Sequence, residues 1–124
     1  MKIFIVLLVI SFYTIYSTYS KGDYSIKAFL DEIVNNGVYK MLKDMRDSFG
    51  CGVAIEACLQ LYPTNDCEKV VYIYMPPAVY KNDFSKFETF EEKMKRKLSS
   101  VKGHLENKNI KLDVLADKLA KKFG

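Results

Sequence analysis

Apolar residues recur at helical spacing through most of the chain, and this periodicity constrains the fold more than any other sequence feature. Between residues 25 and 36, apolar side chains occupy positions i, i+3, i+4, i+7 and i+8, namely Ile26, Phe29, Leu30, Ile33 and Val34. An Asn-Asn-Gly triplet at 35–37 suits a left-handed helix end, and the pattern resumes over residues 38–49. Such spacing places one apolar stripe on each helix. The N-terminal half is therefore predicted to hold two amphipathic helices.

Residues 53–75 fit two structures, and the choice between them decides the fold class. As a helix, residues 52–62 place five small or apolar side chains on one face, namely Val53, Ala54, Ala57, Cys58 and Leu61. As a strand, the same segment alternates in polarity, and residues 70–75 are rich in β-branched and aromatic side chains, which favour strands. A two-stranded hairpin alone is only marginally stable. We therefore favour a helix over 52–62 and leave 68–75 open.

The C-terminal half predicts a connector followed by a long helix. A Pro-Pro pair at 76–77 stops the preceding element and begins an extended stretch to about residue 82. Ser85 and Glu88 match an S-x-x-E capping box at a helix start. The apolar face of this helix, which runs to about residue 107, comprises Phe87, Phe90, Met94, Leu98, Val101 and Leu105. Its opposite face is expected to be solvated and charged, with Glu91, Glu92, Lys93, Lys95, Arg96 and Lys97.

Together these patterns predict a mainly α fold, a small helical bundle of four to five helices with one disulfide. An α+β fold that contains a hairpin at about 53–75 is the alternative. Residues 21–124 have the length of one small domain.

Residues 1–20 read as a cleavable secretory signal peptide. Residues 3–10 form an uninterrupted apolar core, and Thr18 and Ser20 are small side chains placed before a cut that would precede Lys21. An uncleaved membrane anchor is the alternative, but the apolar stretch is shorter than the ~20 residues that a spanning helix needs. We therefore expect a secreted, extracellular protein.

The three cysteines follow the predicted signal, in a compartment where disulfides form. If residues 51–58 are one helix, Cys51 and Cys58 lie about 10.5 Å apart along its axis, too far to bond. Cys58 and Cys67 flank a Pro-Thr-Asn-Asp turn that can bring the chain back, so this pairing is favoured, with Cys51–Cys67 as the alternative. In the favoured pairing Cys51 is either a free thiol or the link of a disulfide-bonded homodimer.

Composition and motifs argue against several classes of function. Without Lys2 and the rest of the signal, the chain carries 18 basic and 15 acidic side chains, mostly interleaved. A nucleic-acid-binding protein concentrates its positive charge on one face. His104 is the only histidine, it does not belong to a recognisable Cys-His pair, and the cysteine spacing does not match a zinc site. We expect no nucleic-acid partner, no catalytic residues, no metal and no cofactor.

Aromatic residues concentrate between residues 62 and 90 and suggest a binding role. The simplest interpretation is that they form the core. The alternative is an apolar surface that binds either an apolar small molecule between helices or a protein partner. Its candidate residues are Tyr72, Tyr74, Tyr80, Phe84, Phe87 and Phe90. The leading hypothesis is therefore a secreted, non-enzymatic protein that acts by binding.

Residues 110–123 predict a last amphipathic helix, which carries lysines beside its apolar face. Such a helix can lie on an anionic membrane surface with its apolar side down. The residues that would face the membrane are Leu112, Leu115, Leu119 and Phe123. A C-terminal Gly124 would also suit amidation in the secretory pathway. The alternative function is thus a membrane-active protein of the venom or defence type.

Overall fold

The structure, a computed structural model, describes residues 25–124. The predicted signal peptide at 1–20 lies outside the described residues. The chain divides between Glu32 and Ile33 into two units, and the second unit, Ile33–Gly124, contains the features discussed below. Residues 25–35 are helical, as the periodicity predicts, and the helix is followed by a turn at 36–37.

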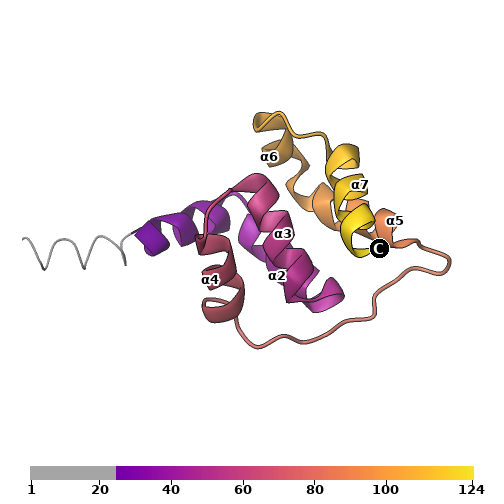
Figure 1. The fold of residues 1–124 in the computed structure, drawn as a ribbon, viewed down its shortest axis with the longest axis horizontal. Coiled ribbons are helices and arrows are strands. Elements are labelled where there is room, and N and C mark those ends of the chain that lie inside the picture. Colours follow the sequence, from indigo (N-terminus) through magenta and orange to yellow (C-terminus); the bar gives the residue numbers. More distant parts are fainter. Residues whose placement is uncertain (1–24) are drawn as a thin grey trace, which may run out of the picture. The chain divides into compact units, whose positions relative to one another are not determined.

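The described residues form helices and no strand, which confirms the mainly α prediction (Figure 1). After residues 25–35, the α-helices are α2 (Val38–Phe49), α3 (Cys51–Leu61), α4 (Asp66–Ile73), α5 (Phe90–Leu98), α6 (Lys102–Asn107) and α7 (Leu112–Phe123). One 3₁₀ turn, η1 (Ser99–Val101), joins α5 to α6. The alternative hairpin at 53–75 is therefore wrong. The helices outnumber the four to five expected, because the segment left open at 68–75 is helical and the predicted long helix is divided.

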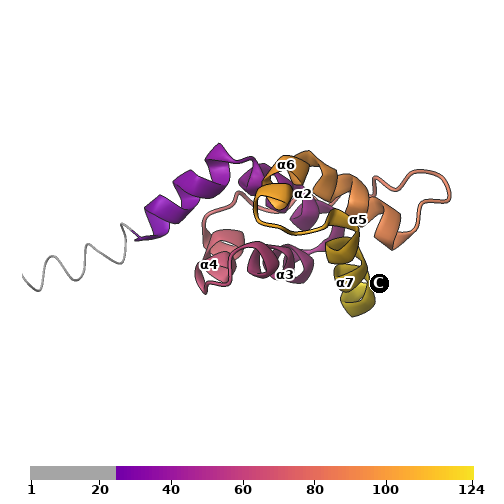
Figure 2. The same cartoon turned by 90° about the horizontal axis from the view of Figure 1, so that it is seen from above.

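α2 and α3 form a tight pair in which α3 runs back along α2 (Figures 1 and 2). A single residue joins them, and Gly50 has a φ of 102°, which L side chains rarely adopt. The buried face of α2 is formed by Val38, Met41, Leu42 and Met45. α3 opposes it with Val53, Ala54, Ala57, Cys58 and Leu61. The two alanines are fully buried, and their small side chains let the helices approach closely.

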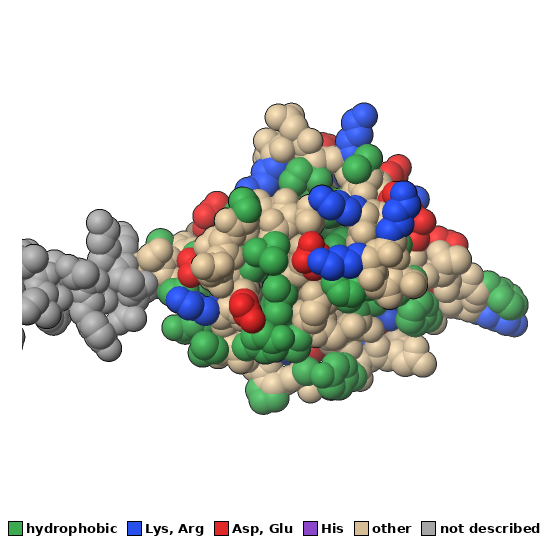
Figure 3. Space-filling view, in the orientation of Figure 1, with side chains coloured by type: hydrophobic (Ala, Val, Ile, Leu, Met, Phe, Trp, Pro, Cys, Tyr) green, Lys and Arg blue, Asp and Glu red, His purple; other side chains and the backbone are tan. Residues whose placement is uncertain are grey.

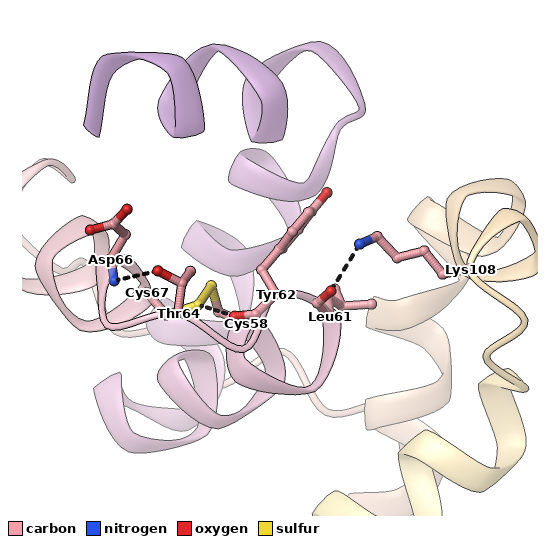
Figure 4. Close-up of a disulfide and its surroundings, with 7 residues drawn as sticks. All are labelled: Cys58, Leu61, Tyr62, Thr64, Asp66, Cys67 and Lys108. Carbon is pink, nitrogen blue, oxygen red and sulfur yellow. Dashed lines mark hydrogen bonds between the residues drawn. A yellow bond between two sulfur atoms is a disulfide. The ribbon is translucent and has the colours of Figure 1, made fainter. Parts of the chain in front are cut away.

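α4 is linked to α3 by a disulfide across a short turn (Figure 4). Cys58 and Cys67 are bonded at 2.05 Å, with their Cα atoms 5.7 Å apart. In the turn between them, the Thr64 hydroxyl oxygen accepts a hydrogen bond from the Asp66 N–H at 3.3 Å, close to the start of α4. The disulfide therefore holds a helix of only eight residues against the rest of the fold.

α5 packs mainly against α7 and also contacts α2. Met94 and Leu98 of α5 are fully buried, and Leu115 and Leu119 of α7 are almost fully buried. Helix α5 ends where two serines bond back to the preceding turn: the Ser99 hydroxyl donates to the Arg96 carbonyl at 2.6 Å. The Ser100 hydroxyl donates to the Lys97 carbonyl at 2.9 Å. Such back-bonding competes with regular helix, and this explains why the predicted helix to residue 107 is interrupted.

The start of α5 also differs from the prediction. The capping residue is Thr89, whose hydroxyl oxygen accepts a hydrogen bond from the Glu92 N–H at 3.1 Å and donates to the Glu92 carboxylate at 3.0 Å. Ser85 and Glu88 instead close a turn, in which the Glu88 N–H donates to the Ser85 carbonyl. Phe87 consequently lies outside the helix and not on its buried face. The fold uses a second capping box, T-x-x-E at Thr89 and Glu92, which begins four residues after the S-x-x-E box.

Replacing Thr89 with alanine should lower the free energy of unfolding by about 1 kcal/mol, because the first turn of α5 loses its side-chain cap. Ser85→Ala is the matched control and should change it by less than about 0.5 kcal/mol. Urea denaturation followed by far-UV circular dichroism measures both. A larger loss for Ser85→Ala than for Thr89→Ala would show that α5 begins at the earlier box.

The double variant Cys58→Ser/Cys67→Ser should lower the free energy of unfolding by about 2–3 kcal/mol, the entropy of closing a loop of this length. Cys51→Ser removes the free thiol and should stay within about 1 kcal/mol of the unaltered protein. Denaturation with and without reductant provides the measurement. Reductant should destabilise Cys51→Ser but leave the double variant unchanged, and an equal response of both would contradict the pairing.

Candidate functional site

The cysteines leave one thiol free. Cys58 and Cys67 are fully buried in their disulfide, which is the pairing that the sequence favours. Cys51 is a free, half-buried thiol at the first position of α3. A disulfide-linked homodimer through Cys51 stays a prediction.

Five of the six aromatic residues proposed as a binding surface lie on the outside of the described structure: Tyr72, Tyr74, Tyr80, Phe84 and Phe87. The sixth, Phe90, is half-buried and packs its ring against Phe49 with the centroids 4.8 Å apart. The simplest interpretation of the sequence, that these aromatic residues form the core, is therefore wrong for five of the six.

The end of α4 and the chain that follows it expose several large apolar side chains. α4 buries Cys67, Val70 and Val71 against the fold, and helical spacing then turns its last residues outward. We define the apolar surface as Tyr72, Ile73, Tyr74, Val79 and Tyr80, all exposed. Hydrophobic side chains gather along the lower side of Figure 3, where Figure 1 places α4 and the following chain. Ile73 and Val79 were missed, because an apolar residue is assigned to a surface only once the buried face of its helix is known.

The connector, residues 74–89, is extended but is held by α2. The N–H of Val79 donates to the carboxylate of Asp47 at 3.2 Å, and the N–H of Lys81 donates to the Asp47 carbonyl at 2.7 Å. The Asp47 carboxylate also pairs with Arg46 at 3.1 Å, and both side chains are buried. The connector is thus attached to a helix through its backbone, and its side chains remain free to face outward.

A charged cluster, Asp44, Asp83, Lys93 and Lys97, fixes the middle of the connector to α2 and α5. Lys93 has no exposed surface, and its ammonium lies 2.8 Å from the Asp83 carboxylate. Lys97 bonds to the same carboxylate and lies 2.9 Å from that of Asp44. The expectation that these two lysines belong to a solvated helix face is therefore wrong.

Aromatic rings complete the surroundings of Lys93. Its ammonium lies 3.8 Å from the centroid of the Phe84 ring and 4.9 Å from that of Phe49. A cation over an aromatic face is stabilised most where water is excluded. Phe84 is therefore only partly available at the surface, since one side of its ring faces Lys93.

The charges of the cluster shift the pKa values of Asp83 and Lys97. Hydrogen bonds from Lys93 and then Lys97 hold the pKa of the Asp83 carboxyl far below its usual range, against the opposing effect of burial. Burial alone would lower the pKa of Lys97, but hydrogen bonds to Asp83 and Asp44 outweigh it and raise the pKa. At neutral pH Asp83 and Lys97 are therefore ionised, and the connector is held by charge-assisted bonds.

The connector tip, residues 84–87, projects beyond the ends of the neighbouring helices in both ribbon views (Figures 1 and 2). Its turn is closed between Ser85 and Glu88, and the Glu88 carboxylate accepts bonds from the Arg96 guanidinium at 2.9 and 3.0 Å. Phe87 has a φ of 70° and is 89% exposed. A bulky residue in this left-handed region is strained by about 1–2 kcal/mol, so the fold holds an unburied phenyl ring in an unfavourable backbone conformation.

The helix proposed to lie on a membrane has its apolar face in the core. Leu115 and Leu119 are almost completely buried, and Leu112 is half-buried. Phe123 is the exposed member of the predicted face. A membrane contact through this face would therefore require α7 to leave α5, with which it packs.

His104 belongs to a polar cluster. Its Nε2 lies 2.7 Å from the Tyr62 hydroxyl, which accepts a hydrogen bond from the Asn36 amide at 2.6 Å. Lys108 bonds to the Leu61 carbonyl at 2.9 Å and covers the Tyr62 ring (Figure 4). The described partners of His104 are thus a phenol and an amide, an arrangement that joins α3 to α6.

A groove of about 1110 Å³ runs between the end of α5, α6 and the start of α7. Its apolar lining residues are Leu105, Ile110, Leu112 and Val114. Charged residues share the lining, namely Lys95, Arg96, Lys102, Glu106, Lys111 and Asp113. Most of the surface that lines the groove is apolar, but charged side chains surround it and it is open to solvent.

Within residues 25–124, no group of three or more His, Cys, Asp or Glu side chains is placed to hold a metal ion. In the same range, none of the helices combines the length and the apolar character needed to cross a bilayer. Comparison of the chain with protein-family models, with curated proteins and with solved structures found no match.

The charged cluster predicts a pH-dependent stability. Asp83→Asn leaves two buried ammonium groups without their shared carboxylate, and it should lower the free energy of unfolding at pH 7 by about 2 kcal/mol. The depressed pKa of Asp83 stabilises the fold above the unfolded pKa of about 4, and this contribution is lost as the pH falls further. Urea denaturation at a series of pH values from 7 to 3 measures the free energy of unfolding of Asp83→Asn and of the unaltered protein.

The difference between the two proteins should therefore be full at pH 7 and shrink below about pH 4. Asp117→Asn is the control, because Asp117 forms an exposed pair with Lys121, and it should stay within about 0.5 kcal/mol at every pH. A pH-independent difference for Asp83→Asn would contradict the assignment.

Proposed function

We propose that this chain is a secreted, non-enzymatic binding protein whose partner is a protein that docks on the apolar surface. The observation that carries the proposal is the exposure of five large apolar side chains on one short stretch of chain, with Tyr72 60% and Tyr80 73% exposed. Several large exposed apolar side chains on one short segment are unusual for a surface and indicate an interaction site.

The chemistry of the apolar surface suits a protein interface. Three of its members are tyrosines, which combine a large apolar ring with a polar hydroxyl and are enriched among the residues that dominate binding energy. Ile73 and Val79 each add a purely apolar side chain to this surface. The surface is thus amphipathic enough to stay hydrated when free and apolar enough to be buried by a partner.

The apolar surface is also held in place before any partner arrives. The disulfide ties α4 to α3, the Tyr39 hydroxyl donates to the Tyr74 carbonyl at 2.8 Å, and Asp47 binds the connector at Val79 and Lys81. Preorganisation of this kind reduces the conformational entropy that is lost on binding.

A protein partner is favoured over an apolar small molecule. The exposed apolar residues lie on a helix end and an extended segment, whereas a small apolar ligand requires a concave pocket that covers most of its surface. The groove between α5, α6 and α7 is concave, but it is open to solvent and half of the residues that line it are charged.

Two features support an extracellular location. The first twenty residues have the pattern of a secretory signal. The disulfide between Cys58 and Cys67 belongs to the kind that forms and persists in oxidising compartments.

The double variant Tyr72→Ser/Ile73→Ser should lower the affinity for the partner at least about tenfold, because two central apolar contacts are lost. Fluorescently labelled protein, recovered from the medium of expressing cells, is titrated onto the extracellular fluid and cell surfaces of the source tissue. Saturable binding that excess unlabelled protein displaces is the measured quantity.

Val114→Ser is the matched control, since Val114 is an equally exposed apolar residue on α7. It should bind as the unaltered protein does. Equal binding by Tyr72→Ser/Ile73→Ser and the control would sink the proposal. Displacement of the label by a fatty acid, with no change in the double variant, would instead favour an apolar small molecule.

A further inference from the structure

The exposed side of the connector is more basic than its sequence indicates. Its only acidic residues are Asp83 and Glu88, and both are neutralised from inside. Asp83 forms ion pairs with Lys93 and Lys97, while Glu88 accepts two bonds from Arg96 and keeps only 9% of its side chain exposed. Both acidic side chains of the connector are therefore paired with basic residues of α5.

The basic residues of the connector are not neutralised in this way. Lys81 and Lys86 are exposed and form no ion pair with the residues that the structure describes. The Lys86 ammonium lies 5.2 Å from the centroid of the Phe87 ring. The connector tip therefore presents an exposed phenyl ring beside an ammonium group, with a second ammonium on the same segment.

The conformation of the turn at residues 85–88 keeps the Phe87 ring exposed. Phe87 occupies a left-handed conformation that favours glycine or asparagine, and its ring packs into no core. Strained residues persist where the surrounding structure determines them, and they cluster at functional sites. Here the determining contacts are the Ser85–Glu88 turn and the Glu88–Arg96 pair.

We propose that the connector tip, together with Lys81, docks onto bilayers that contain anionic lipids, with the Phe87 ring inserted at the level of the headgroups. The two lysines then lie near lipid phosphates. Aromatic rings are favoured at membrane–water interfaces, and each lysine near an anionic bilayer adds attraction that salt screens. Lys81 directly follows Tyr80 of the apolar surface, but the connector tip lies outside that surface, and the inference does not depend on a protein partner.

A projecting tip suits a bilayer better than a flat protein interface would. Both ribbon views show the connector extending past α5 (Figures 1 and 2), and the far end of this projection carries hydrophobic and basic atoms in the space-filling view (Figure 3). The ring can therefore reach a planar surface while the helices remain outside the membrane. No element has to unfold, in contrast to a membrane contact through the buried face of α7.

The experiment uses the fact that the chain contains no tryptophan. Phe87→Trp places a single fluorescent reporter at the tip, and Val114→Trp places one at an exposed position on α7. Both proteins, recovered from the medium of expressing cells and shown to be folded by circular dichroism, are titrated with vesicles of phosphatidylcholine alone or mixed with phosphatidylserine.

Phe87→Trp should shift its emission to shorter wavelength with the anionic vesicles only, and high salt should reverse the shift; Val114→Trp should not respond. In vesicle flotation, Phe87→Ser and Lys86→Glu should each bind less than the unaltered protein. The apparent partition coefficient of each variant should be lower by about tenfold or more. Tyr72→Ser/Ile73→Ser should float as the unaltered protein does, which separates this test from that of the proposed function.

Four results would overturn the inference. The first is unchanged emission of Phe87→Trp with anionic vesicles, and the second is an equal shift for Val114→Trp. The third is flotation that survives both Phe87→Ser and Lys86→Glu. A shift of Phe87→Trp that requires a purified protein partner and not lipid would likewise overturn it and assign the tip to a protein interface.

Discussion

The position of the connector and the burial of two lysines of α5 depend on the carboxylate of Asp83. Lys93 has no exposed surface, and an ammonium group in such a place is tolerated only when an opposite charge accompanies it. Asp83 supplies that charge to Lys93 and also bonds to Lys97. Because Asp83 lies in the connector and both lysines lie on α5, the same ion pairs that make the buried lysines tolerable also fix the connector at Asp83.

The surface that results is a consequence of this attachment and of the disulfide. α4 has three buried side chains, too few for so short a helix to be stable alone, and the Cys58–Cys67 bond supplies the remaining constraint. The connector then leaves α4 without secondary structure of its own and is bound through its backbone at Asp47. The side chains of Val79 and Tyr80 are therefore exposed to solvent.

The sequence predicted those elements whose pattern is local. α2 follows from spacing alone, whereas α3 and the Cys58–Cys67 pairing were favoured by spacing and turn chemistry over a hairpin and a Cys51–Cys67 bond, and the structure decides both choices. The prediction failed where two local signals competed, as for the boxes at Ser85 and Thr89. It failed again where serine hydroxyls divided one apolar stripe into α5 and α6. Lys93 is the instructive case for the candidate site: it stands among charged residues and has the sequence context of a solvated face, and only tertiary contact with Asp83 places it inside.

The same reasoning explains why membrane contact is better assigned to the connector than to α7. An amphipathic helix can satisfy its apolar face either in a bilayer or in a core, and the near-complete burial of Leu115 and Leu119 shows that α7 uses the core. Phe87 has no such alternative, because it projects from a strained turn that Arg96 and Glu88 hold in place. The residue for which the fold provides no apolar contact is the one with most to gain from an external apolar phase.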